Sequence, residues 1–192
     1  MKLWKSLLAG NRSASGNITW RIGEWQTHEG EIVLCGSGFH ASPTIQDAIG
    51  FVAPGVIASV EVRGDKIADA NKSVHRKMRV LRTWPWTQEA SVRLAVYAAE
   101  LVVKNFERKY PDDNRPRATI AAATAWLADP TAANARAAYS AAASAYSAAS
   151  AADRAAASAA YRADSAEREK VSRKIHQFAV SLLIERRKGG GE

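Results

Sequence analysis

The clearest alternation of apolar and polar residues runs from Val56 to Arg63, where every second side chain is apolar. A period of two predicts a half-buried β-strand. A second strand is predicted from His75 to Trp84 and ends at Pro85, which supplies no ladder donor. Both strands should turn their Val and Met side chains inward. Less regular patterns predict strands at 2–9, 18–27 and 31–34, a hairpin turn at 28–31, and a short helix at 45–52.

The spacing of apolar residues changes to a helical one beyond about residue 86. Apolar positions then recur at intervals of four and three: Val92, Val96, Ala99, Val103 and Phe106. This stripe predicts an amphipathic helix that begins after Thr87 and ends near Tyr110. A second helix is expected from Arg115 to Leu127. The short connection between them favours antiparallel neighbours.

Alanine dominates the chain from Thr131 to about Ala166, where it occupies every position of a heptad seam. The seam positions are Ala135, Ala138, Ala142, Ala145, Ala149, Ala152, Ala156, Ala159, Ala163 and Ala166. Methyl groups allow a neighbouring helix to approach closely but bury little apolar area. We therefore expect a bulky neighbour to cover this helix, either within the chain or in a homodimer. At 167–170 a charged cluster interrupts the seam, and we expect a break or a change of packing partner there.

Together these patterns predict an α+β protein. A small β-rich domain with one short helix should occupy residues 1–85. An antiparallel helical bundle containing the long alanine-rich helix should occupy residues 86–188, followed by a flexible tail at 189–192.

Composition limits the functional classes. The formal net charge of +8 suits nucleic acid, an acidic protein surface or an anionic ligand. Cys35 is the single cysteine, which rules out an intramolecular disulfide and favours a reducing compartment. The four histidines are widely separated in the sequence, so we expect no metal site and no cofactor. No apolar run reaches the ~20 residues of a membrane span, and we expect a cytoplasmic protein in a bacterial cell.

His40 is the strongest single candidate for a functional side chain. Gly36 and Gly38 permit unusual backbone conformations, so the chain should turn sharply and present Phe39 and His40. A following helix N-terminus could hold an anion beside His40. The alternative is that Phe39 is buried and His40 is hydrogen-bonded, and that both simply pack a tight turn.

A second candidate site is the basic stretch from residue 63 to residue 86. Its proposed nucleic-acid contacts are Arg63, Lys66, Arg76, Lys77, Arg79, Arg82 and Trp86. Basic groups interleaved with aromatic residues are typical of RNA and single-stranded DNA binding. The alternative is a solvated strand face with its tryptophans in the core.

Two rows of large side chains follow the alanine-rich helix outside its seam. The proposed partner-binding residues are Tyr139, Tyr146, Arg154, Tyr161 and Arg168. Tyrosine and arginine are favoured anchors of protein interfaces. The alternative is that the tyrosines pack against the chain's own first two long helices.

Several motifs resemble known families. The segments 2–5, 34–42, 47–48 and 60–64 resemble a family of uncharacterised phage and bacterial proteins. Residues 113–117, followed by an alanine-rich helix with Trp126, resemble an immunity-protein family of polymorphic toxin systems. These resemblances imply a protein encoded by a phage or another mobile element, and a binder rather than a metabolic enzyme.

A looser resemblance, to ADP-ribosyltransferases, lies in the strand, the Gly-Phe-His-Ala-Ser turn and the helix that follows it. Such enzymes need a carboxylate to stabilise an oxocarbenium-like transition state. The late strand contains none between His75 and Arg79, so Glu61 would have to substitute. This departure favours a degenerate, non-catalytic version over an enzyme centred on His40 and Glu61.

We therefore expect a non-enzymatic protein-binding protein that inhibits a bacterial defence system, in the manner of an anti-CRISPR, or acts as an immunity protein. The alternatives are an RNA- or DNA-binding module and an ADP-ribosyltransferase-like enzyme.

Overall fold

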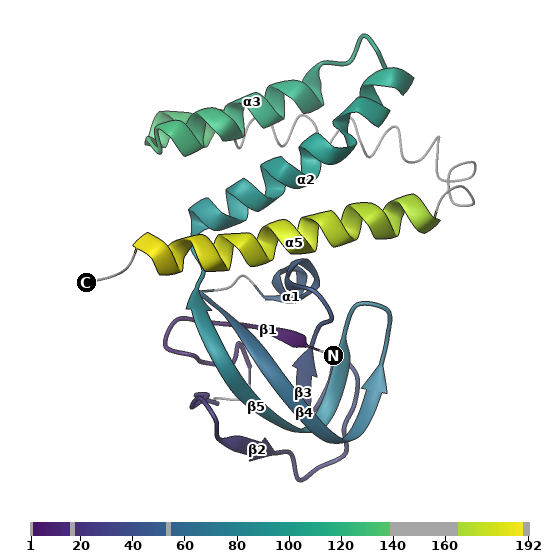
Figure 1. Cartoon of the computed structure of the whole chain (residues 1–192), viewed down its shortest axis with the longest axis vertical. Helices are drawn as coiled ribbons and strands as arrows, with labels where there is room; N and C mark the ends of the chain where they lie inside the picture. Colours follow the sequence, from purple (N-terminus) through teal and green to yellow (C-terminus); the bar gives the residue numbers. More distant parts are fainter. Residues whose placement is uncertain (1, 16–17, 53–54, 139–164, 190–192) are drawn as a thin grey trace. The chain divides into compact units, whose positions relative to one another are not determined.

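The computed structural model describes residues 2–15, 18–52, 55–138 and 165–189 (Figure 1). The chain divides into two compact units, Met1–Thr87 with Ala179–Glu192, and Gln88–Phe178. The first boundary lies near the residue 85 expected from sequence. The second differs, because the chain from Ala179 onward belongs with the first unit rather than with the helical domain.

The first unit is built on a five-stranded antiparallel sheet. Its order is β1-β4-β5-β2, and β3 also pairs with β5. The strands are β1 (Leu3–Leu7), β2 (Trp25–Thr27), β3 (Phe39–Ala41), β4 (Val56–Ala68) and β5 (Ser73–Pro85). An antiparallel sheet followed by helices confirms the predicted α+β class.

The long hairpin of β4 and β5 supplies most of the core, as the alternation predicts. Met78 and Val80 are fully buried, as expected of the inward positions on β5. The core cluster comprises Leu3, Leu7, Trp20, Phe39, Ala41, Ala58, Val60, Met78 and Val80. Ile57 and Ser59 lie on the other face of β4 and are buried as well. The sheet is therefore covered on both faces here, which simple alternation does not reveal.

Four of these strands close into a ring. β1 pairs with β4, β4 with β5, and β5 with β3. Directly after β3, Ser42 exchanges two backbone hydrogen bonds with Trp4 of β1, at 2.8 and 2.9 Å. This bridge brings β1 against β3 at one end of the sheet and positions both strands around the site described below.

Of the strands predicted in the first unit, the one at 18–27 is only partly present and the one at 31–34 is absent. The segment 18–27 forms a strand only at β2, and residues 31–34 form none, so the hairpin predicted at 28–31 is absent. β2 pairs instead with β5, through Trp25 and Arg79 among others. Both β4 and β5 are longer than expected, because they extend to Ala68 and from Ser73 and are separated by a short turn.

The predicted short helix is present as α1 (Ile45–Phe51). Its N-cap is Thr44, whose side chain accepts a hydrogen bond from the Asp47 amide at 3.2 Å. Ile45 and Ala48 are its buried residues.

The second unit contains α2 (Gln88–Lys109), α3 (Arg115–Ala128) and the first part of α5 (Ser165–Gly189). The helices α2 and α3 lie side by side (Figure 1), joined by an ion pair between Glu107 and Arg117. Tyr97 of α2 stacks on Phe178 of α5, with ring centroids 4.2 Å apart.

The alanine-rich segment is described only at its start, where residues 132–138 are helical. Of the two alternatives expected at 167–170, the break is absent, because α5 runs through these residues without interruption. A change of packing partner there stays a prediction.

Candidate functional site

A cavity of about 660 Å³ lies in the first unit. Its walls come from β1, the loop after it, the turn at 35–38, β3, α1 and the turn between β4 and β5. The residues used below are Lys5, Ser13, Cys35, His40, Phe51 and Lys72. This volume is within the range of small-molecule binding sites.

The turn that forms one wall depends on Gly38. Its φ is +103°, and a Cβ placed there would lie 2.7 Å from Cγ2 of Val74. Only glycine adopts this positive φ without strain and also leaves room for the Val74 side chain. Cys35 also has a positive φ, +64°, which is uncommon for a residue with a side chain. The sharp turn expected from Gly36 and Gly38 is therefore present.

His40 holds this turn together. Its Nε2 accepts a hydrogen bond from the amide of Cys35 at 2.9 Å. Burial lowers the pKa of His40, the charges of Lys5 and Lys72 lower it further, and a hydrogen bond with the backbone of Gly38 opposes them. The ring is therefore neutral near pH 7. Buried Phe39 beside hydrogen-bonded His40 is the tight-turn alternative described above, although His40 also lines the cavity.

Lys5 is a site residue that the sequence analysis missed. It lies between Leu3 and Leu7 at two-residue spacing, so it shares the core-facing side of β1. Its Nζ donates a hydrogen bond to the carbonyl of His40 at 3.0 Å and lies 5.5 Å from the centroid of the Trp20 ring. Burial lowers the pKa of Lys5 to about 8. A lysine flanked by core leucines is the signal that could have identified it.

Lys72, in the turn between β4 and β5, also lines the cavity. Its Nζ donates to Sγ of Cys35 at 2.7 Å and lies 4.6 Å from the centroid of the Phe51 ring. Phe51 is 49% exposed, which is high for a large apolar side chain. Cys35 is exposed and reduced.

The lining of the cavity is electropositive. It includes two lysines, and none of the described residues that line it is an aspartate or a glutamate. Ser13 also lines it, and its Oγ accepts a hydrogen bond from Nε1 of Trp20 at 2.8 Å, so its own hydroxyl proton is available to donate. The arrangement can accept an anion and offers it hydroxyl donors.

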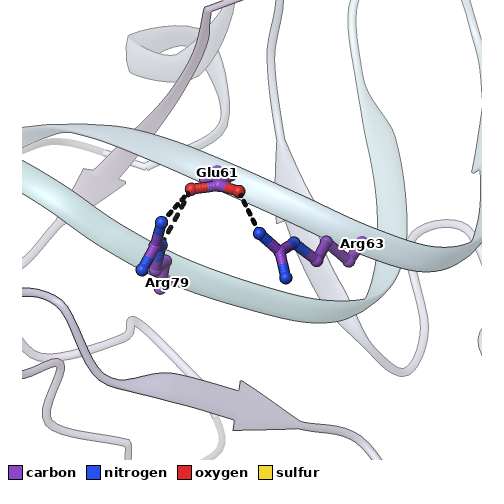
Figure 2. Close-up of polar contacts among 3 residues, drawn as sticks. All are labelled: Glu61, Arg63 and Arg79. Atoms are coloured by element: carbon purple, nitrogen blue, oxygen red, sulfur yellow. Dashed lines mark hydrogen bonds and ion pairs between the residues drawn. The ribbon is translucent and has the colours of Figure 1, made fainter.

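Glu61, the predicted catalytic partner of His40, lies elsewhere. Figure 2 shows its carboxylate between two guanidinium groups. Nε of Arg79 donates to it at 2.8 Å and Nη2 of Arg63 at 3.0 Å. The hydrogen bond from Arg79 is the main reason that the pKa of Glu61 is lowered. Glu61 does not line the cavity, so the structure does not bring it together with His40.

The predicted nucleic-acid surface is partly neutralised. Arg63 and Arg79 pair with Glu61, and Arg76 pairs with Asp65 at 2.6 Å. Both Arg63 and Arg79 also lie over the ring of Trp25, at 4.6 and 4.9 Å. The exposed basic side chains Lys66, Lys77 and Arg82 remain. Trp86 is only 4% exposed, so it is not available to stack on a base.

The predicted partner-binding residues Tyr139, Tyr146, Arg154 and Tyr161 lie outside the described residues. Arg168 belongs to α5, but its side chain is also outside the description. Their roles stay predictions. In the described part of the chain, no three His, Cys, Asp or Glu side chains gather where a metal ion could bind. None of the described helices is long and apolar enough to cross a membrane.

Residues 1–91 match a family described as a domain of unknown function, DUF7666. The match covers the cavity residues named above and stops early in α2. Neither the curated proteins nor the solved structures include a match to the chain.

Proposed function

We propose that the protein is a non-enzymatic binding protein whose first unit holds an anionic group in the cavity beside Lys5, His40 and Lys72. One observation carries the proposal: two lysines line this cavity, and no carboxylate among the described lining residues balances them. A desolvated ammonium group without a counter-ion costs free energy. A bound anion would recover that cost, so the lining of this cavity favours an anionic ligand.

Binding suits the site better than catalysis. The Nε2 atom of His40 already accepts the Cys35 amide, so it is not free to abstract a proton. Glu61 is held by Arg63 and Arg79 away from the cavity. An ADP-ribosyltransferase-like mechanism would need both residues at one reaction centre. A counter-defence or immunity role, and a protein partner bound along the alanine-rich helix, remain proposals from the sequence.

Sulfate and chloride titrations at matched ionic strength test this proposal. Sulfate should bind the full-length protein in a saturable way, measured by calorimetry, and chloride should not. The variant Lys5→Met plus Lys72→Met should lose sulfate binding. The control Lys66→Met plus Lys77→Met removes two exposed lysines outside the cavity and should bind normally. Equal sulfate affinity in both double variants would overturn the proposal.

A further inference from the structure

The number of positive charges at the cavity indicates the kind of anion. Nζ of Lys5 donates to the His40 carbonyl at 3.0 Å, and Nζ of Lys72 donates at 2.7 Å to Sγ of Cys35, whose amide donates to Nε2 of His40. The two ammonium groups therefore lie on either side of His40 along one hydrogen-bonded chain. A phosphate monoester carries about −1.5 to −2 charges near pH 7. Two lysines therefore match one phosphate monoester, whereas a single carboxylate would leave about one positive charge unbalanced. Lysine is a common phosphate-binding residue.

The hydroxyl groups at the cavity match the same ligand. Five serines line it: Ser6, Ser13, Ser15, Ser37 and Ser42. The Oγ of Ser13 accepts a hydrogen bond from Nε1 of Trp20, so its own proton is available to donate, whereas the Ser37 hydroxyl already donates to the carbonyl of Glu31. A phosphate monoester offers three strong acceptor oxygens, so it can use hydroxyl donors in addition to the two ammonium groups.

The cavity is also larger than a phosphate group needs, and part of its wall is aromatic. Its volume of about 660 Å³ leaves room for an organic body beyond the anion. Phe51 lines it with an unusually exposed ring. Lys72 lies against this ring and against Cys35, so a phosphate held by Lys72 would bring an attached group close to Phe51. An exposed aromatic ring is a stacking surface for a planar ligand.

We propose that the cavity binds a phosphate monoester carried by a small molecule with a planar ring, of the mononucleotide class. This inference rests on the proposed anion-binding function and narrows it. Phosphate contacts come from Lys5, Lys72 and the hydroxyl of Ser13, and Phe51 stacks on the ring of the ligand.

Calorimetry on the full-length protein, at fixed ionic strength, tests the ligand class with five probes. These are adenosine 5′-monophosphate, ribose 5-phosphate, adenosine, L-glutamate and a short phosphoserine peptide. Stacking on one aromatic ring strengthens binding about ten-fold, so the nucleotide should bind about ten-fold tighter than ribose 5-phosphate. Adenosine alone should bind much more weakly than either. Protection of Cys35 from alkylation by the nucleotide should report occupation of this cavity, because Cys35 lines it.

Two sets of variants test which residues bind the phosphate group and which bind the planar ring of the ligand. Phe51→Ala should remove the advantage of the nucleotide over ribose 5-phosphate, whereas Ile67→Ala should not, because Ile67 is similarly exposed but lies outside the cavity. Lys5→Met plus Lys72→Met should abolish binding of both phosphates. Circular dichroism confirms that each variant is folded.

Three results would overturn the inference. If adenosine binds as tightly as the nucleotide, the phosphate group does not contribute to binding. If Phe51→Ala binds the nucleotide as tightly as the unmodified protein does, the ring of the ligand does not stack on Phe51. A phosphopeptide that binds more tightly than the nucleotide would point to a protein ligand. Glutamate binding without phosphate binding would overturn this inference and leave the anion-binding proposal standing. Failure of every anion, sulfate included, would overturn both.

Discussion

The Nζ atom of Lys5 donates a hydrogen bond to the backbone carbonyl of His40 at 3.0 Å. This bond links the middle of β1 to β3 and fixes an ammonium group on the core-facing side of β1. A charge in that position is unfavourable for folding alone, because burial penalises the charged form. Binding of an anion by the ammonium group would explain why a charged side chain occupies this buried position.

The first prediction concerns the pH dependence of anion binding. The pKa of Lys5 is about 8, and only its protonated form attracts an anion. Anion affinity should therefore be highest below pH 8 and should fall as the pH rises through this value, measured by calorimetry from pH 7 to about 9.5. The other titratable groups that line the cavity are His28, Cys35, His40 and Lys72. Lys5→Met should weaken binding at pH 7 and flatten the fall near pH 8. A steep fall that persists in Lys5→Met would assign it to another group.

The second prediction concerns the turn at residues 35–38. Gly38→Ala should destabilise the protein by about 2 kcal/mol, because the new methyl group meets Val74 and the backbone is left-handed. Gly50→Ala is the control, since Gly50 lies in α1 with open space around its Cβ position. It should be neutral or slightly stabilising, by up to about 1 kcal/mol. Urea unfolding measures both, and equal effects would contradict the role given to Gly38.

The third prediction concerns stability in mild acid. Burial is the main reason that the pKa values of His40 and His75 are lowered, and nearby positive charges lower them further. Both rings are neutral in the folded protein and take up protons more readily when it unfolds. Their contribution to stability is therefore present above the unfolded pKa of about 6.5 and is lost as the pH falls below it.

Urea midpoints between pH 7.5 and about 5 should decline accordingly. His75→Gln should reduce this decline, because His75 is only 2% exposed and accepts or donates one hydrogen bond to Ser73. An unchanged slope in this variant would show that other groups cause the loss.

The fourth prediction concerns Glu61. Its pKa is lowered chiefly by the hydrogen bond from Arg79, so its stabilising effect should exist above the unfolded pKa and disappear as the pH falls through the lowered one. Glu61→Gln should lower the melting temperature slightly at pH 7 and low salt, and less at high salt, because the cluster is open to solvent. Sulfate binding should be unchanged. Loss of that binding in Glu61→Gln would contradict the separation of Glu61 from the cavity.

The fifth prediction concerns the alanine-rich helix. Affinity capture from a bacterial lysate should retain a stoichiometric protein partner that is lost from Tyr139→Ala plus Tyr146→Ala. Tyr110→Ala is the control, because Tyr110 follows α2 and packs on Phe106. Mass spectrometry identifies the captured protein. Capture of RNA instead, with affinity that falls steeply with salt, would favour the nucleic-acid alternative.

Periodicity predicts the elements whose side chains alternate or recur cleanly. The strands β4 and β5 and the helices α2 and α3 are near their expected positions, because apolar spacing reflects one buried face. In the segment 18–34, apolar spacing does not predict the observed elements. Its bulky residues Trp20 and Ile32 are buried, but they pack into the core from irregular backbone rather than from strands. Burial alone does not specify a ladder, which also needs a free strand edge.

The candidate site is harder to predict because its charged groups come from distant segments. His40 and the glycine turn are visible in the sequence, whereas Lys5 and Lys72 join them only through the pairing of β3 with β5 and the bridge from Trp4 to Ser42. A lysine in a polar-apolar pattern is read as exposed. The sequence suggests Glu61 as a partner of His40, but Glu61 does not join the site. Its hydrogen-bond partners are Arg63 on its own strand and Arg79 on the adjacent strand.

The first unit combines residues 1–87 with residues from 179 onward, which affects the order of folding. The buried side chains of Ala179, Leu182 and Leu183 belong to the same unit as β1. A ribosome must therefore synthesise the chain past residue 183 before that unit can be completed. Nascent chains released before residue 179 should expose apolar surface and depend on chaperones, even though every strand of the sheet has already been synthesised.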